Sequence, residues 1–170
     1  MKLEGIFLRA LEPEDLEVLL QLENDSSLWK YSNRTEPFSR DLLQKYIDQQ
    51  HQDIFEVKQK RFVVSYHDQT PIGFVDLFDF EPLHRRAGIG VIIHPNYQGK
   101  GYARRALELV EEYAKKQLNL HSLYANIAEE NSASLKVFES CEFRRIAEKK
   151  EWNFYEGRFH DEYLYQKLLS

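Results

Sequence analysis

The sequence contains one cysteine, Cys141, in 170 residues. A single thiol cannot form an internal disulfide, and without a second cysteine the chain has no thiolate spacing typical of a zinc site. We therefore expect no metal cofactor and a reducing compartment, with the cytoplasm as the simplest setting.

Long apolar runs and a positive charge excess are also missing. No stretch is long and apolar enough to cross a bilayer, and the amino-terminal residues do not form a signal peptide. The net charge is −5, whereas a protein that holds nucleic-acid phosphates needs a dense positive face. We expect a soluble chain with no membrane or nucleic-acid partner.

Glycine and proline are few, at 7 and 5 residues, and they fall between periodic segments rather than in a linker or low-complexity tract. This pattern predicts a single domain over residues 1–170. The periodicity of apolar residues predicts strands at 6–9, 62–66, 72–80, 87–93 and 122–127, helices after Pro13, Ser39, Gly101 and Asn131, and two last strands around a turn at 156–157.

The most informative segment is the strand, loop and helix at residues 91–104. The first N–H groups of a helix lack internal partners and carry the positive end of the helix dipole, so they bind anions well. Gly99 and Gly101 would let a diphosphate approach the backbone, and Lys100 and Arg104 add positive charge. This pattern predicts a phosphate site.

The same segment resembles the Gln/Arg-x-x-Gly-x-Gly/Ala signature of the GNAT acetyltransferases, which Gln98, Gly101 and Ala103 match. Residues 8–15, 72–75, 84–87 and 130–134 also resemble that family. The resemblance implies an α/β fold with a mixed, mostly antiparallel central sheet flanked by helices on both faces. Within the family, the chain is most similar to the enzymes that acetylate diamines and polyamines.

The resemblance implies acetyl-CoA as co-substrate. Strand residues at 91–93 would bind the pantetheine arm, in an opening between this strand and the one at 122–127, and the segment 98–104 would hold the diphosphate. Asn131 would bind pantetheine and Lys136 a cofactor phosphate, although Asn131 also suits a helix cap and Lys136 a solvated surface position. The implied cofactor residues are Val91, Ile92, Ile93, Gln98, Gly99, Lys100, Gly101, Tyr102, Ala103, Arg104, Asn131 and Lys136.

Acetyl transfer needs a proton donor for the leaving thiolate. Polyamine enzymes of the family often use a tyrosine on the helix that follows the asparagine, and here that position is Phe138, which cannot donate a proton. The alternatives are another hydroxyl, Tyr97 or Tyr124, or water. We take Tyr124 as the candidate.

The amine must lose a proton before it attacks, because an ammonium with a pKa of about 10 is mostly protonated at neutral pH. Related sequences often carry a glutamate where this chain has Gly88. Asp76 is the candidate base. Asp79 points to the opposite face of its strand unless a bulge intervenes.

Acidic residues near the aromatic loop suit a cationic acceptor. Glu36 and Asp41 are candidates for binding a second positive charge of a diamine, together with Asp79. Trp29, Tyr31 and Phe38 either contact the acceptor or close the core over the first helices.

The leading function is transfer of an acetyl group to a primary amine of a small molecule, such as a diamine or polyamine. Two alternatives stay open, which are acetylation of a protein amino terminus and a CoA-binding regulatory module with weak catalysis. A homo-oligomer fits the family, but no apolar stripe in the sequence requires one.

Overall fold

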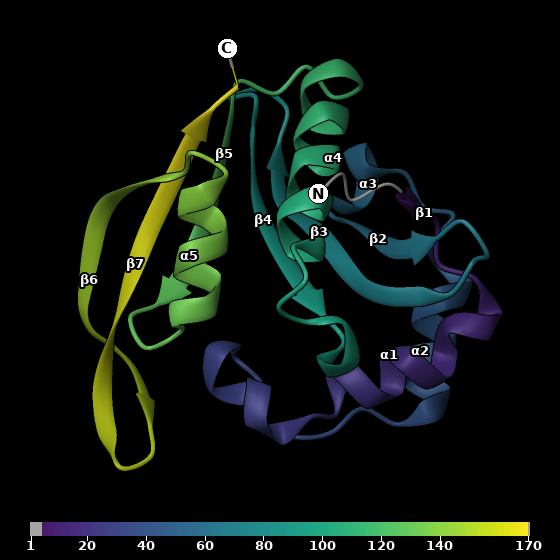
Figure 1. Ribbon diagram of the computed structural model, residues 1–170, viewed down its shortest axis with the longest axis horizontal. Coiled ribbons are helices and arrows are strands. Elements are labelled where there is room, and N and C mark those ends of the chain that lie inside the picture. Colours follow the sequence, from purple (N-terminus) through teal and green to yellow (C-terminus); the bar gives the residue numbers. More distant parts are fainter. Residues whose placement is uncertain (1–4, 170) are drawn as a thin grey trace.

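The computed structural model describes residues 5–169 (Figure 1). Seven strands form one sheet in the order β1-β2-β3-β4-β5-β7-β6. The strands are β1 (Ile6–Arg9), β2 (Lys60–Tyr66), β3 (Pro71–Glu81), β4 (Arg86–Ile93), β5 (Ser122–Ala128), β6 (Arg144–Tyr155) and β7 (Arg158–Leu168). The α-helices are α1 (Leu16–Glu23), α2 (Arg40–Asp48), α3 (Ile54–Val57), α4 (Tyr102–Lys116) and α5 (Ser132–Ser140), and short 3-10 helices lie at Pro13–Asp15, Ser26–Tyr31 and Pro95–Tyr97.

Every strand pair in the sheet is antiparallel except β4 with β5. A parallel pair needs a long crossover connection, which α4 provides here. The mixed sheet with helices confirms the predicted α/β fold.

The parallel pair β4–β5 stays together over only three residue pairs, from Arg86 with Ser122 to Gly88 with Tyr124. Beyond Gly88, β4 continues in register with β3, and β5 continues in register with β7. The two strands therefore separate toward the carboxyl end of β4, which leaves the opening that the resemblance implies.

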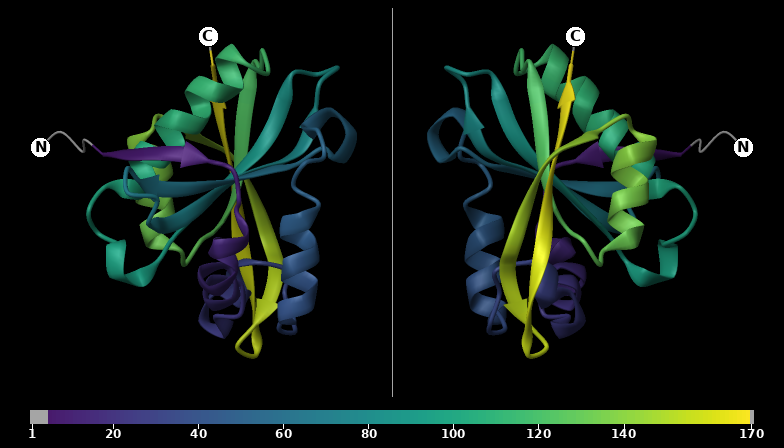
Figure 2. Two further views of the ribbon diagram at one scale, coloured as in Figure 1. Left: turned by 90° about the vertical axis from the view of Figure 1, so that its right-hand side faces the viewer. Right: turned by 90° about the vertical axis from the view of Figure 1, so that its left-hand side faces the viewer.

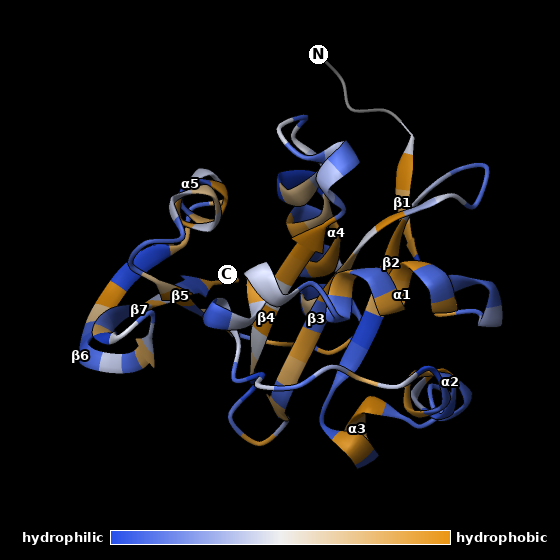
Figure 3. Ribbon diagram, turned by 90° about the horizontal axis from the view of Figure 1, so that it is seen from below, coloured by the Kyte–Doolittle hydropathy of each residue, from blue (hydrophilic) through white to orange (hydrophobic). Residues whose placement is uncertain are grey.

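Helices cover both faces of the sheet, with α4 and α5 on one side of the strands and α2 on the other (Figure 2). The α4 face is the larger core, where α4 buries Ala106, Leu107, Val110 and Ala114 against alternate residues of β3, β4 and β5. The α1 and α2 face is a smaller core around Phe74. Apolar residues accordingly concentrate on β3 and β4 in the middle of the sheet (Figure 3).

Two local features differ from the sequence-based expectation. The apolar spacing of Leu42, Leu43 and Ile47 favours a common buried side of α2, but Leu42 is 49% exposed and α2 packs through Leu43 and Ile47. Asp53 caps the short helix α3 by accepting a hydrogen bond from the Phe55 N–H, in a segment that periodicity left unassigned because one helical turn is too short to show it. No helix among residues 5–169 has the length and hydropathy required to span a membrane.

Candidate active site

A cleft of about 310 Å³ lies where β4 and β5 separate. A wider space of about 770 Å³ adjoins it on the side of the β6–β7 hairpin. The two spaces share Trp29, Tyr31, Ser32, Arg34, Ile89, Gly90 and Asn126. The smaller cleft takes its walls from α1, the 3-10 helix after it, β2 to β5 and α5. Its lining includes Glu23, Tyr31, Arg61, Asp76, Val91, Ile92, Asn126, Asn131, Ser134 and Phe138.

The loop between β4 and α4 is shaped by two glycines in the left-handed region. Gly99 has φ 73° and Gly101, the amino-terminal cap of α4, has φ 85°. A Cβ on Gly99 would meet no protein atom within 4 Å, so the loop leaves open space there. The Gln98 side chain donates to the Ile93 carbonyl at 2.9 Å and ties the loop to the end of β4.

The amino terminus of α4 presents free backbone donors. The first intrahelical bond runs from the Arg105 N–H to the Gly101 carbonyl at 3.2 Å, so the N–H groups of Tyr102, Ala103 and Arg104 have no acceptor within the helix. Gly101 has no side chain to cap them. These donors, the positive end of the helix dipole and the uncrowded Gly99 fit a diphosphate.

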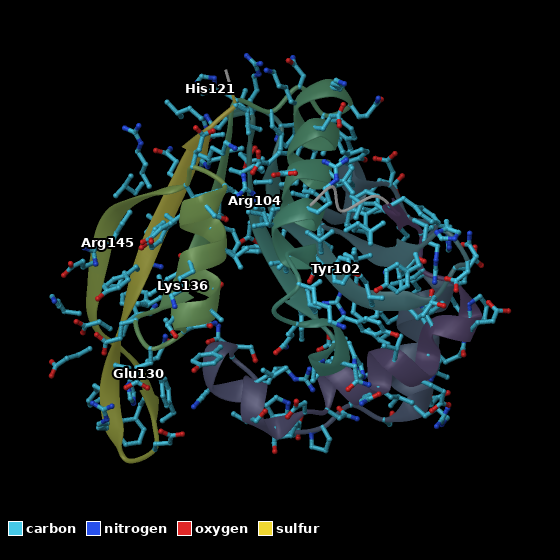
Figure 4. All side chains as sticks on the ribbon, in the orientation of Figure 1. Tyr102, Arg104, His121, Glu130, Lys136 and Arg145 are labelled. Carbon is cyan, nitrogen blue, oxygen red and sulfur yellow. The ribbon has the colours of Figure 1, made fainter. Side chains whose placement is uncertain are left out.

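The charged side chains of this loop have only local partners. Lys100 Nζ donates to the Asn96 carbonyl at 3.3 Å, and Arg104 Nε donates to Glu108 at 3.1 Å. Arg104 on α4 and Lys136 on α5 come from the two helices that stand on either side of the opening (Figure 4). Both side chains are exposed, so they are available to an anion without breaking a buried contact.

Tyr102 points the other way, toward β2 (Figure 4). Its hydroxyl accepts a hydrogen bond from the Tyr66 hydroxyl at 2.8 Å. Because ionisation of Tyr66 would abolish the bond that it donates, this contact raises the pKa of Tyr66 to about 12. Tyr102 therefore offers its backbone N–H, rather than its side chain, to the anion site.

Asn131 has a position that suits both roles considered for it from the sequence, a cap of α5 and a contact for pantetheine. Its Oδ1 caps α5 by accepting from the Ser134 N–H at 3.3 Å, and the residue also lines the cleft. On β4, Val91 and Ile92 line the cleft, whereas Ile93 is buried and contributes the carbonyl that holds Gln98.

Asp76 lines the cleft in an ion pair. Arg61 Nε and Nη2 donate to its two oxygens at 2.6 and 2.8 Å, and Arg61 also contacts Glu23, which in turn pairs with Arg34 at 3.0 Å. These two bonds leave one lone pair on each Asp76 oxygen open toward the cleft's other groups. Sequence reasoning missed Glu23, Arg34 and Arg61, because their pairing joins α1, β2, β3 and a loop that are distant in the chain.

Tyr124 lies on β5 at the last paired position before the strands separate, and it is not among the residues that line either space. A bulge does intervene in β3, since the register shifts between Phe78 and Glu81 and Asp79 has φ 45°. Burial, followed by the negative charge of Asp79, raises the pKa of Tyr124. The bulge thus brings Asp79 and Tyr124 together, outside the cleft.

Phe138 lines the cleft and packs edge to face on Phe143, with ring centroids 5.0 Å apart. The hydroxyl groups that do line the cleft belong to Tyr31, Ser32 and Ser134. Ser134 lies one helical turn before Phe138 on α5, so the i, i+4 spacing was a signal available in the sequence.

Glu36 and Asp41 lie outside both spaces. Asp41 pairs with Lys45 at 2.8 Å on the exposed side of α2. Cys141 is a buried thiol whose Sγ lies 3.8 Å from the Arg104 carbonyl, and burial raises its pKa.

Comparison with known proteins agrees with this geometry. The acetyltransferase (GNAT) domain family matches residues 6–144. A spermidine N(1)-acetyltransferase from Escherichia coli is 35% identical over 162 residues, covering 92% of this chain and 82% of that protein.

Solved structures are similar as well. The crystal structure of spermidine N-acetyltransferase from Vibrio cholerae in complex with CoA and spermine has a TM-score of 0.87 and 32% identity, and covers 97% of this chain and 96% of that one. A dodecameric structure of spermidine N-acetyltransferase from the same organism has a TM-score of 0.80 and 32% identity, covering 98% and 95%. The chain therefore belongs to the GNAT acetyltransferase family, and it is an N-acetyltransferase that uses acetyl-CoA.

Proposed function

We propose that this enzyme acetylates a primary amine of a polyamine. The observation that carries the proposal is the cleft between β4 and β5, whose wall holds the carboxylates Glu23 of α1 and Asp76 of β3. The β4 strand that lines this cleft leads directly into the free backbone donors at the start of α4. The relatives named above act on spermidine, and the adjoining space adds a third carboxylate, Glu162. Glu23 and Asp76 already pair with Arg34 and Arg61, so an ammonium group of the acceptor would share them with these arginines.

We assign the binding of acetyl-CoA, the acetyl donor, to the β4–α4 segment. The N–H groups at 102–104 and the cations Lys100 and Arg104 bind the diphosphate, and Gly99 keeps the approach open. Val91, Ile92 and Asn131 contact the pantetheine arm, since they line the cleft between the strands. Lys136 on α5 contacts a phosphate of the nucleotide end.

The amine side is assigned to the ion-pair network of the cleft wall. Asp76 takes the proton of the attacking amine through water, while Arg61 holds its carboxylate in place. The neutral amine then attacks the thioester carbon and the carbon–sulfur bond breaks. The acylated nitrogen gives up its extra proton, which the leaving thiolate needs. The polar side chains on the opposite wall, Tyr31 and Ser134, position a water that delivers it.

Roles for four other residues stay predictions. Tyr124 and Asp79 lie beyond the end of the opening, so any role in proton transfer requires a relay along β5. Glu36 and Asp41 lie on the outside of the aromatic loop and α2, where they would meet a cationic acceptor only during its approach.

The acceptor is tested by following free thiol release from acetyl-CoA with spermidine, spermine and amino-terminal peptides. We expect the polyamines to accelerate release and the peptides not to. A faster reaction with peptides would contradict the proposed acceptor, and CoA binding without acceleration by any amine would favour a regulatory module.

We also propose that copies of the chain associate through the β6–β7 hairpin, in a reducing cytoplasmic setting that suits the buried thiol of Cys141. β6 is an edge strand, and Trp152, Phe154 and Phe159 are 58–65% exposed on this hairpin. Phe154→Glu should lower the mass measured by light scattering, because a charge opposes burial of this surface. An unchanged mass would place the interface elsewhere.

A further inference from the structure

A buried histidine lies where the β6–β7 hairpin meets the turn before α5. His160 on β7 is fully buried, and its ring stacks on Tyr155 with centroids 3.6 Å apart. Its Nε2 lies 3.1 Å from the Tyr155 carbonyl. A carbonyl only accepts hydrogen bonds, so Nε2 carries a proton and Nδ1 is the ring nitrogen left for another partner.

Nδ1 of His160 lies near two carboxylates. His160 Nδ1 is 3.1 Å from Glu130 Oε1 but has no hydrogen-bond partner among the residues that the structure describes. Ligand atoms of Glu129, Glu130 and His160 all lie within 4.8 Å of one another. The buried Nδ1 therefore lacks a partner although a carboxylate is near, and a cation held by both groups would supply one.

We propose that Glu129, Glu130 and His160 form a binding site for a divalent transition-metal ion such as Zn²⁺. Imidazole nitrogen and carboxylate oxygen are both zinc ligands, with bonds of about 2.0–2.2 Å, and three protein ligands leave a fourth position for water. Two tetrahedral ligands at such distances are about 3.4 Å apart, close to the separation of His160 and Glu130. The hydrogen bond from Nε2 to the carbonyl is the outer contact that metal-binding histidines usually make.

The surroundings of the carboxylates fit this assignment. The Tyr155 hydroxyl donates to Glu130 Oε2 at 3.4 Å and holds this carboxylate beside the His160 ring. Arg158 Nη2 also contacts Glu130, but this side chain is 65% exposed and can move into solvent. Arg158 is therefore a competitor of the metal.

A metal here would brace the acceptor side of the enzyme. Glu130 directly precedes Asn131, the cap of α5 that lines the cleft, and it lies where that turn approaches the hairpin (Figure 4). His160 lies on the hairpin whose other strand lines the adjoining space at Asn153 and Tyr155. The ion would join these two walls without touching the reacting atoms.

Titration calorimetry of the chelator-treated full chain with ZnCl₂, in the absence of CoA, tests the proposal. We expect one tight site, with affinity reduced by about 10- to 100-fold or more in His160→Gln and in Glu129→Gln. His51→Gln, which removes an exposed histidine, should leave the affinity unchanged. Arg158→Gln should increase it, because it removes the competing cation.

Circular dichroism of each variant separates lost binding from lost folding, and Glu129→Gln serves if the buried His160→Gln does not fold. Zinc affinity equal in wild type and Glu129→Gln would overturn the proposal. So would nitrogen NMR of the zinc-saturated protein that shows a proton on His160 Nδ1, because the site would then be a buried histidine–glutamate ion pair.

Discussion

Single residues set the chemistry of the cleft, and Phe138 is the clearest departure from the family pattern. Its ring lines the cleft without a polar atom, and the nearby wall offers Ser134 and Tyr31 instead. The sequence identified this departure, because the residue type alone shows that no proton can be donated. It could not identify the replacement, because that depends on which side chains from other elements meet at the opening.

We predict that Phe138→Tyr increases kcat by about tenfold or more, because a phenol facing the cleft supplies the thiolate with a direct proton donor. Initial rates under saturating acetyl-CoA and spermidine measure the effect. Phe138→Leu, which changes the packing but adds no hydroxyl, is the control and should not increase kcat. A rate for the tyrosine variant no higher than that of wild type would show that this position does not approach the sulfur.

At the scale of elements, periodicity predicted the long helix α4, the β2–β3 hairpin and the capped helix α5, because their apolar residues repeat over several turns or pairs. It did not predict the network Glu23–Arg61–Asp76, which joins α1, β2 and β3. Charged residues carry no periodic signal of their partner, so the pairing is visible only in the fold. For the bulge at Asp79, the sequence predicted only its consequence for the direction of Asp79, and not whether the bulge exists.

Arg61 neutralises two carboxylates in a mostly buried position, with 16% of its side chain exposed. Burial alone would lower the pKa of Arg61, but the charges of Asp76 and Glu23 raise this pKa by more than burial lowers it, so Arg61 stays charged. Arg61→Met should lower the free energy of unfolding by roughly 2–4 kcal/mol, because it leaves those charges unpaired. The free energy of unfolding of the variant and of the wild type is measured by urea denaturation.

Arg40→Met is the matched control, since Arg40 pairs with Glu17 on the exposed surface, where solvent screening leaves such a pair little effect on stability. Equal stability losses in the two variants would mean that the network does not hold α1 against the sheet.

The hydrogen bond between Tyr66 and Tyr102 joins β2 to the start of α4 and makes stability depend on pH. The pKa of Tyr66 is about 12 in the fold against an ordinary 10.0. The unfolded chain therefore loses this proton first, and the stability from this group, complete below about pH 10, is lost as the pH rises toward 12.

Tyr102→Phe should return the pKa of Tyr66 toward 10 and weaken this dependence. Carbon NMR of ring-labelled tyrosine follows the titration, and Tyr113→Phe serves as the control because Tyr113 has no contact with this pair in the described hydrogen bonds. An unchanged titration of Tyr66 would show that burial, rather than the bond, sets its pKa.

At the scale of the whole molecule, the separation of β4 and β5 opens the active-site cleft in a sheet that is otherwise continuous. The strand order and the opening were implied by resemblance, and the structure shows their cause in a parallel ladder of only three pairs. The part of the cleft that faces the amine acceptor could not be predicted from the sequence or from the resemblance. It is built from the aromatic loop, the hairpin tip and α1, which come together from both ends of the chain.

The account depends most on the backbone of the β4–α4 loop as the site for the CoA diphosphate, and CoA affinity of Gly99→Val measured by calorimetry tests it most directly. Gly157→Val is the matched control, because Gly157 also has positive φ, at 78°, and open space at its Cβ, but lies in the β6–β7 turn. Both changes strain the backbone equally. We predict that CoA affinity falls at least about tenfold in Gly99→Val and stays at the wild-type value in Gly157→Val. Wild-type affinity in a folded Gly99→Val protein would contradict the assignment.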